Sequence, residues 1–390
     1  MKYVLSDDTW DIKEREALQR VIDSNRFTMG EEVFSFEQEF AEKVGKKYAV
    51  MVNSGSSANL LAVAALFYHG KLQKGDEVIV PAVSWSTTYY PFLQYGLKLK
   101  FVDIDLETLN YSIKKLERAV TKDTKCICVV NLLGNPNEWD KIIQIANTHN
   151  LVLFEDNCES LGGKFQNKEL GTFGEIGTYS TFYSHHICTM EGGVAVTDNE
   201  ELYHLMLSIR AHGWTRNLPE KSSLHEKKAN DFYEMFNFIV PGYNLRPLEM
   251  EGALGKEQLK KMDRFIINRR KNANYFTLRM QNFQDVAIIQ KEIGESSWFG
   301  FSIILKGELE GKRDEICHRL KNVGIEVRPI VTGNFTRNRV IEHFDYSIPE
   351  KLENADYLHL NGFFIGNHSI EINEEIDFFV EEFKKAMGNV

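Results

Sequence analysis

Two adjacent histidines, His185 and His186, stand in the segment TFYSHHICTMEGG, between an apolar run and a Glu-Gly-Gly turn. The run that leads to them, TYSTFYS, predicts a strand, and the run that follows the turn, GVAVTD, predicts another. An imidazole can transfer a proton near neutral pH, because its unperturbed pKa is about 6.5. The segment therefore predicts a proton-transfer site just beyond a strand.

A second polar segment, NSGSSANLL at 53–61, connects a predicted strand to a predicted helix. Gly55 permits a tight turn, and Ser56 and Ser57 lead into the helix. Exposed backbone N–H groups at a helix start, together with two hydroxyls, form an anion site suited to phosphate. The alternative is a serine that only caps the helix.

Two more side chains follow predicted strands. The apolar run LVLFEDNCES ends in Glu155 and Asp156. A buried carboxylate is costly unless a positive group pairs with it, and the protonated nitrogen of a pyridine ring is such a group. Trp85, in PAVSWSTTYY, is placed where an indole can stack on a flat cofactor. The alternatives are an aspartate that caps a turn and a tryptophan of the core.

Alternating strands and helices must position these residues. Continuous apolar runs separated by helical patterns predict a mostly parallel sheet covered on both faces. In such sheets ligands bind beyond the carboxyl ends of the strands, which is where the polar segments fall. The runs lie at 48–54, 76–84, 99–105, 126–134, 151–157, 178–184 and 193–198.

The length of 390 residues predicts two domains, which we divide into a large cofactor-binding domain at 1–250 and a small domain at 251–390. The second begins with a long charged helix and continues as an α+β region. Its last helix carries an apolar stripe that predicts a packing face and nothing more. The stripe consists of Ile372, Ile376, Phe379, Val380 and Phe383.

Composition narrows the class of protein. A net charge of −10 argues against nucleic acid as a partner. The N-terminal segment is acidic where a secretory signal would be apolar, which argues against export. The longest apolar run, 60–68, is too short to span a membrane. Five cysteines predict no disulfide framework, and Cys126 and Cys128 predict a buried strand pair rather than a metal site. We expect a reduced, cytoplasmic protein.

The order of these elements resembles that of fold-type I pyridoxal-phosphate enzymes: phosphate turn, aromatic residue, strand-end aspartate, then Ser180 before the histidines. More specifically, the chain resembles the aminotransferase family that acts on nucleotide-linked 4-keto sugars. The blocks that carry the resemblance are FTMGEEVFSFEQEFAEKVGKKYAVMVNSGSSANLL, EDNCES, STFYSHHICTMEGG and PGYNLRPLEM. The resemblance implies an α/β fold of the aspartate aminotransferase type. Its sheet is mixed, mostly parallel and seven-stranded, helices flank it, and a smaller α+β C-terminal domain follows.

The chain departs from this family at one residue. Most members have a lysine six residues before the Glu of the Glu-Gly-Gly turn, and here that position is His185. Counting forward from the strand gives His186 instead; we choose His185 because the turn anchors the loop. Histidine cannot form the lysine's Schiff base, so pyridoxal or pyridoxamine 5′-phosphate is expected to bind noncovalently.

The departure resembles a small branch of the family, the nucleotide-sugar 3-dehydratases, which the blocks VPAVSWSTTYYP, NLLGNPN, RAHGWTRNLP, GESSWFGFS and RPIVTGNF also resemble. The branch implies C3 dehydration of GDP-4-keto-6-deoxy-D-mannose. L-glutamate supplies the amine, His185 is the catalytic base and then acid, and ammonia and 2-oxoglutarate are released. It also implies a homodimer with shared active sites and neither a metal nor an iron–sulfur cluster.

Further roles come from the resemblance, position by position. The implied cofactor-binding residues are Gly55, Ser56, Trp85, Asp156, Glu159, Ser180 and, from the partner subunit, Asn244. The implied substrate-binding residues are Asn25, Arg26, Phe27, Thr28, His212, Arg216, Arg246 and Arg328.

Two alternatives stay open at this point. The chain could be an aminotransferase or a CDP-sugar dehydratase that carries an iron–sulfur cluster. It could instead be a non-catalytic protein that binds pyridoxal phosphate and a nucleotide sugar. A non-catalytic protein would be expected to have lost the residues of the phosphate turn and Asp156, the acid that pairs with the pyridine nitrogen. Both are present in this sequence.

Overall fold

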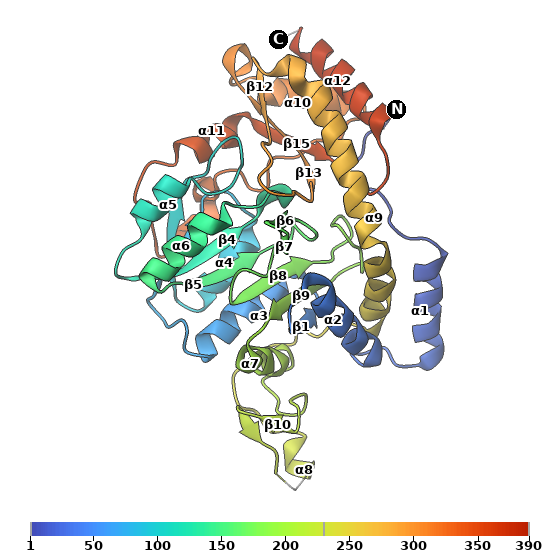
Figure 1. The fold of residues 1–390 in the computed structure, drawn as a ribbon, viewed down its shortest axis with the longest axis vertical. Helices are drawn as coiled ribbons and strands as arrows, with labels where there is room; N and C mark the ends of the chain where they lie inside the picture. Colours follow the sequence, from blue (N-terminus) through green and yellow to red (C-terminus); the bar gives the residue numbers. More distant parts are fainter. Residues whose placement is uncertain (1, 229–230, 389–390) are drawn as a thin grey trace.

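A computed structural model describes residues 2–228 and 231–388. Its centre is an eight-stranded sheet with the strand order β1-β9-β8-β5-β4-β2-β3-β14 (Figure 1). The strands are β1 Tyr48–Val52, β2 Glu77–Pro81, β3 Lys98–Val102, β4 Thr124–Val130, β5 Val152–Asp156, β8 Ile176–Ser180, β9 Gly193–Thr197 and β14 Tyr346–Ser347.

The sheet is mixed and mostly parallel, as predicted. Strand β9 runs antiparallel to both of its neighbours, β1 and β8, and the other strand pairs are parallel. Seven of the strands correspond to the seven predicted runs. The prediction of seven strands was wrong by one, because β14 adds an edge strand of two exposed residues that no apolar run announces.

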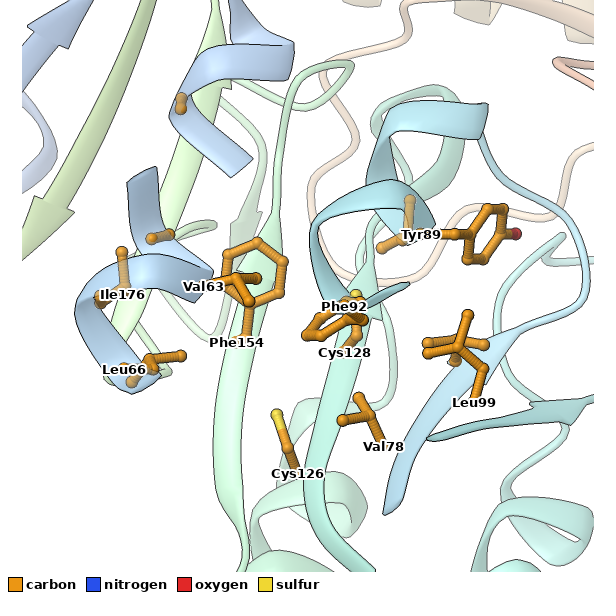
Figure 2. Packing of buried hydrophobic residues seen from close by; sticks show 14 of the residues in the cluster. Val63, Leu66, Val78, Tyr89, Phe92, Leu99, Cys126, Cys128, Phe154 and Ile176 are labelled. Atoms are coloured by element: carbon orange, nitrogen blue, oxygen red, sulfur yellow. The ribbon is translucent and has the colours of Figure 1, made fainter. Parts of the chain in front are cut away.

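Helices cover both faces of the sheet, which explains the continuous apolar runs. On one face α3 Gly55–Tyr68, α4 Ser86–Gln94 and α7 Glu200–Arg210 enclose the largest hydrophobic core, part of which Figure 2 shows. On the other face α5 Ile113–Ala119 and α6 Trp139–His149 pack on alternate strand residues such as Ile127. Cys126 and Cys128 are fully buried in the first core, so the predicted buried strand pair is confirmed.

Two N-terminal helices, α1 Ile12–Ser24 and α2 Glu31–Val44, pack against the long helix α9 Glu249–Met280. A capping box between Asp11 and Glu14 begins α1. The first turn of α2 has its carboxylate supplied by α9: Glu249 accepts hydrogen bonds from the backbone N–H groups of Gly30 (2.6 Å) and Glu32 (2.7 Å). The entry into α2 is therefore tied to α9.

The C-terminal part forms a second core around a three-stranded sheet. Strands β12 Ala287–Ile289, β13 Gly300–Leu305 and β15 Gly362–Gly366 are antiparallel, and α10 Arg313–Asn322, α11 Glu353–Asn361 and α12 Asn373–Met387 accompany them. All five residues of the predicted stripe lie in this core. Ile372 directly precedes α12, and the other four belong to the helix. Helix α9 contributes Phe276 to this core and Phe265 to the core beside α2. The domain boundary at 250/251 stays a prediction.

Short elements complete the described residues. A projection that includes β10 Lys221–Ser222, β11 His225–Glu226 and α8 Asp231–Glu234 extends away from the sheet beyond α7 (Figure 1). Across residues 2–228 and 231–388, no helix is long and apolar enough to span a membrane. The remaining elements are the hairpin β6 Lys164–Phe165 and β7 Lys168–Glu169, and the 3-10 turns η1 Leu132–Gly134, η2 Gln281–Phe283, η3 Gly307–Leu309, η4 Phe335–Arg337 and η5 Arg339–His343.

Candidate active site

A cavity of about 380 Å³ lies beyond the carboxyl ends of the central strands. Its walls come from the start of α3, the connection between β2 and α4, the ends of β4 and β5, and the segment that follows β8. These are the strand ends at which the sequence placed its polar residues. The cavity brings together six of the predicted cofactor-binding residues and the predicted catalytic one: Gly55, Ser56, Trp85, Asp156, Glu159, Ser180 and His185.

The start of α3 forms one end of the cavity. The Ser54 hydroxyl caps the helix by accepting from the Ser57 N–H (3.1 Å), while the Ser56 hydroxyl donates to Thr87 Oγ1 (2.9 Å). A Cβ on Gly55 would lie 2.7 Å from the Ser180 Cβ, so only glycine lets the helix start approach β8 this closely. Backbone N–H groups and several hydroxyls thus converge on one point, an arrangement suited to an anion.

Asp156, at the end of β5, is buried with neutral partners. Its carboxylate accepts from Asn59 Nδ2 (2.8 Å), from the Thr88 hydroxyl (2.7 Å) and from the Cys158 N–H (3.1 Å). Among the described residues no ion pair involves Asp156. Because a buried charge is stabilised by an opposite charge, this carboxylate suits a cationic group of a ligand.

Trp85 and Glu159 complete the walls near this carboxylate. Trp85 precedes α4 and is 57% exposed, so its indole is free to stack on a planar ligand. Glu159 is half-buried, and its Oε2 accepts from the Leu133 N–H (3.1 Å). Burial raises the pKa of Glu159 to about 7, so its carboxyl group is close to half protonated near neutral pH.

The histidine segment is a closed loop between β8 and β9. The hydroxyls of Thr181 and Thr189 are hydrogen-bonded across its base (2.5 Å), and the Cys188 N–H donates to Gln258 Oε1 on α9 (3.0 Å). His185 lines the cavity, whereas His186 does not and is only 1% exposed. Of the two adjacent histidines, the fold presents His185 to a ligand.

His185 is neutral at physiological pH. Burial, together with the nearby Arg269 cation, lowers the pKa of His185 to about 4. Its Nδ1 is enclosed without a hydrogen-bond partner, so the ring nitrogen available to the cavity is Nε2. A neutral imidazole of this kind can accept a proton, and its conjugate imidazolium is a strong acid.

The other predicted residues lie outside the cavity. His212, Arg216 and Arg246 gather around Trp214, with the guanidinium carbon of each arginine 5.9 Å from the indole. Asn244 is exposed and accepts from Arg246 Nε (3.0 Å). Residues 25–28, predicted to touch the sugar nucleotide, are exposed after α1. Arg328 lines a second cavity of about 280 Å³, which shares Ser184 with the first.

Several residues of the cavity escaped the sequence analysis. Asn59 lies one helical turn after Ser56, so the periodicity of α3 could have found it. Thr87 and Thr88 belong to the run of hydroxyl residues after Trp85. Val331 lies far along the chain in the block RPIVTGNF, which the resemblance singled out without giving Val331 a role.

Residues 9–383 match the model of the DegT/DnrJ/EryC1/StrS aminotransferase family. The chain belongs to this family. The family prediction and the aminotransferase-type fold are thereby confirmed.

Close relatives within the DegT/DnrJ/EryC1/StrS family carry one activity in their names. The chain is 57% identical over 390 residues to the GDP-4-keto-6-deoxy-D-mannose 3-dehydratase of Escherichia coli O55:H7, with 98% of this chain and 100% of that protein covered. A solved histidine-to-asparagine variant of GDP-4-keto-6-deoxymannose-3-dehydratase with bound GDP-perosamine matches with a TM-score of 0.96 at 56% identity, covering 98% and 100% of the two chains. A structure of that enzyme with a trapped PLP-glutamate geminal diamine matches with the same values.

The cavity fits the pyridoxal phosphate of this aminotransferase family. Gly55 lets the helix start lie close to Ser180, since a Cβ would come within 2.7 Å of the Ser180 Cβ. Among the described residues, the hydrogen-bond partners of the buried Asp156 carboxylate are neutral. No lysine of the described residues lines the cavity. Among the described residues there is also no cluster of three or more His, Cys, Asp or Glu side chains that could hold a metal ion. The expected absence of an iron–sulfur cluster stays a prediction.

Proposed function

We propose that this protein is a 3-dehydratase of GDP-4-keto-6-deoxy-D-mannose that uses L-glutamate as its amine donor and binds pyridoxal or pyridoxamine 5′-phosphate noncovalently. The products are GDP-4-keto-3,6-dideoxy-D-mannose, ammonia and 2-oxoglutarate. The observation that carries the proposal is the pairing of a phosphate turn and a buried ring acid with His185 instead of a lysine, in a chain 57% identical to a dehydratase of this name.

The cofactor would be held by residues at the ends of four strands, β1, β2, β5 and β8. We assign its phosphate to the backbone at Gly55 and Ser56 and to the Ser180 hydroxyl, where the helix start is open to an anion. Trp85 stacks on the ring, and Asp156 pairs with the ring nitrogen. When bound, the cofactor supplies an amine that condenses with the sugar ketone and a ring that accepts electron density.

Glu159 is assigned to the neighbourhood of the ring oxygen. Its Oε2 accepts from the Leu133 N–H, and its raised pKa of about 7 allows the carboxyl group to donate or to accept a hydrogen bond there. The same protonation keeps a second full negative charge away from Asp156. Asp156 and Glu159 are therefore suited to different tasks.

His185 carries the proton transfers. The neutral imidazole accepts a proton at Nε2, the nitrogen that faces the cavity. Once protonated beside Arg269 in a buried setting, the imidazolium is a strong acid and donates that proton to the departing C3 hydroxyl. One side chain thus acts first as base and then as acid. Within the part of the chain that the structure describes, no lysine lines the cavity, so no side-chain amine is there to attach the cofactor covalently.

We propose further that the enzyme is a cytoplasmic homodimer whose active sites are shared. Asn244 is exposed and does not line the cavity of its own chain, which supports a role in the site of the partner copy. Arg216 and Arg246 place two cations over Trp214 next to it, where the His212 ring also packs, and arginine forks suit the diphosphate of the substrate. We assign Asn25 to Thr28 to the sugar nucleotide as well, and Arg328 to the glutamate carboxylate or the diphosphate.

A product assay tests the activity. The protein receives pyridoxal phosphate, L-glutamate and GDP-4-keto-6-deoxy-D-mannose, and mass spectrometry follows the sugar nucleotide while ammonia is quantified. We expect the sugar nucleotide to lose one oxygen atom overall, because the C3 hydroxyl leaves as water and hydrolysis restores the C4 ketone, and we expect one ammonia per deoxysugar. An aminated sugar would instead identify an aminotransferase, and no turnover with tight cofactor binding would reject this substrate.

A further inference from the structure

His186, the second histidine of the pair, is buried away from the cavity and makes one polar contact. Its Nε2 lies 3.2 Å from the carbonyl oxygen of Ser297. A carbonyl only accepts, so Nε2 carries the proton and donates. Burial holds the pKa of His186 far below its ordinary value, so the ring is neutral and Nδ1 is left as a buried acceptor without a partner. An apolar side chain would avoid that orphaned nitrogen, so what histidine adds at this position is the N–H to Ser297.

The Ser297 carbonyl belongs to a segment, residues 296–299, that needs anchors. Trp298 has a φ of 49°, a left-handed conformation that a bulky side chain adopts only when its surroundings impose it. The N–H groups of Ser297 and Phe299 donate to the carbonyls of Gly134 and Leu133, each at 3.0 Å. Arg269 donates to the Phe299 carbonyl (3.2 Å) from α9. His186 supplies the anchor that comes from the histidine loop itself.

This segment presents the ring of Phe299 to both histidines. The Phe299 centroid lies 5.1 Å from that of His185 and 5.8 Å from that of His186. Phe182 contacts His185 from another side, with a centroid distance of 5.9 Å. Catalytic histidines are commonly oriented by a hydrogen bond to the second ring nitrogen, but Nδ1 of His185 has none among the described residues. Ring packing and the backbone of Phe182 orient this imidazole.

We infer that His186 is a positioning residue: through the Ser297 carbonyl it fixes Phe299, and Phe299 holds the imidazole of His185 toward the cavity. The inference rests on the proposed function, because that proposal makes His185 the base. It gives the second histidine a task that needs neither contact with substrate nor a change in its own charge.

The pKa of His185 reports on whether Phe299 covers its imidazole, because burial and nearby charges set that pKa. Arg269 approaches from α9 and His186 from the same loop, while the carboxyl groups of Asp156, Glu159 and Glu191 line the cavity. Burial is the largest cause of the lowered pKa of His185. If Phe299 loses its place, water reaches the imidazole, and the pKa of His185 rises toward the ordinary value.

The test compares two substitutions at His186. His186→Leu keeps the volume and removes the N–H, whereas His186→Gln keeps a donor near the position of Nε2. His149→Leu, at the exposed end of α6, is the matched control for loss of a histidine. The holoproteins are prepared with ¹³C-labelled histidine rings, the His185 resonance is assigned by its loss in His185→Asn, and each is titrated from pH 5 to pH 8.

We expect His185 to stay neutral across this range in the parent, in His186→Gln and in His149→Leu. In His186→Leu its titration midpoint moves up into the range, and kcat for dehydration falls by about 10- to 100-fold with an unchanged KM, as for a misplaced catalytic group. Rescue by glutamine separates the lost N–H from a general loss of packing. A parental titration and a parental kcat in a folded His186→Leu protein would overturn the inference.

Phe299→Leu provides an independent arm if His186→Leu does not fold. It leaves the Ser297 anchor in place and removes the aromatic contact with His185, so the same upward shift of the His185 titration is expected. An unshifted titration in this variant would also overturn the inference. The ring titrations need no turnover, so a parent protein that does not dehydrate the sugar would reject the proposed function and leave these results readable.

Discussion

At the scale of single residues, the chemistry depends on the difference between an imidazole and an amine at position 185. Both groups can move a proton, but only a primary amine can form a carbon–nitrogen double bond with pyridoxal phosphate. His185 lines the same cavity as Asp156, and burial together with the Arg269 cation keeps the imidazole neutral. The same surroundings would lower the pKa of a lysine and leave its amine nucleophilic.

We therefore predict that His185→Lys converts noncovalent cofactor binding into covalent binding. After incubation with pyridoxal phosphate and reduction with borohydride, mass spectrometry should find the cofactor attached to the variant and absent from the parent. Dehydration should fall by about 10²- to 10⁴-fold, the range for loss of a general acid–base group.

The variant His185→Asn is the control for this prediction, because it removes the imidazole without adding an amine. It should lose dehydration to the same extent and take up no cofactor covalently. Deoxysugar and ammonia released at the parental rate by His185→Lys would show that His185 is not the base.

At the scale of elements, the phosphate turn depends on how closely α3 approaches β8. A Cβ on Gly55 would lie 2.7 Å from the Ser180 Cβ and 2.9 Å from the Cys158 sulfur. Alanine favours a helix over glycine by up to about 1 kcal/mol, whereas overpacking costs about 1–3 kcal/mol. The gain in helix propensity and the cost of overpacking partly cancel in the free energy of unfolding. The added Cβ still pushes α3 away from β8 and changes the geometry of the anion site.

Gly55→Ala is accordingly expected to weaken cofactor binding more than folding. The Kd for pyridoxal phosphate, measured by titration of the apoprotein, should rise by at least about tenfold, equivalent to roughly 1.4 kcal/mol. The melting temperature of the apoprotein should change by only a few degrees. Gly388→Ala, where a Cβ meets no atom closer than 3.7 Å, is the control. An unchanged Kd in Gly55→Ala would remove the turn from the phosphate site.

The elements also show how far sequence reasoning reaches. Seven strands were predicted because their residues are buried on both faces and form continuous apolar runs, as in β4. Strand β14 was missed, since its two residues are exposed and pair only with β3. The turn residues of the cavity follow predicted strands and could be found. Phe299 and Val331 lie in the blocks GESSWFGFS and RPIVTGNF, which resemble the dehydratase branch, but their approach to the site depends on tertiary packing, which no local pattern predicts.

At the scale of the whole molecule, one chain forms the cavity, but some of the residues predicted to bind cofactor or substrate lie outside it. Asn244 is exposed, and His212, Arg216 and Arg246 surround Trp214 outside the cavity. A twofold dimer brings the same surface of each copy to the other copy, so residues outside one cavity can complete the second one.

A shared site makes a prediction that a self-contained site does not. Two inactive variants, His185→Asn and Asn244→Asp, are unfolded together and refolded as a mixture. In a mixed dimer, one site then combines an intact His185 from one copy with an intact Asn244 from the other, while the second site carries both changes. Random pairing makes half of the dimers mixed, so about a quarter of the parental activity should return. Each variant refolded alone should stay inactive, and parent protein taken through the same procedure sets the full value. If Asn244 instead served its own chain, every site in the mixture would carry one of the two changes, and activity would not rise above that of the separate variants.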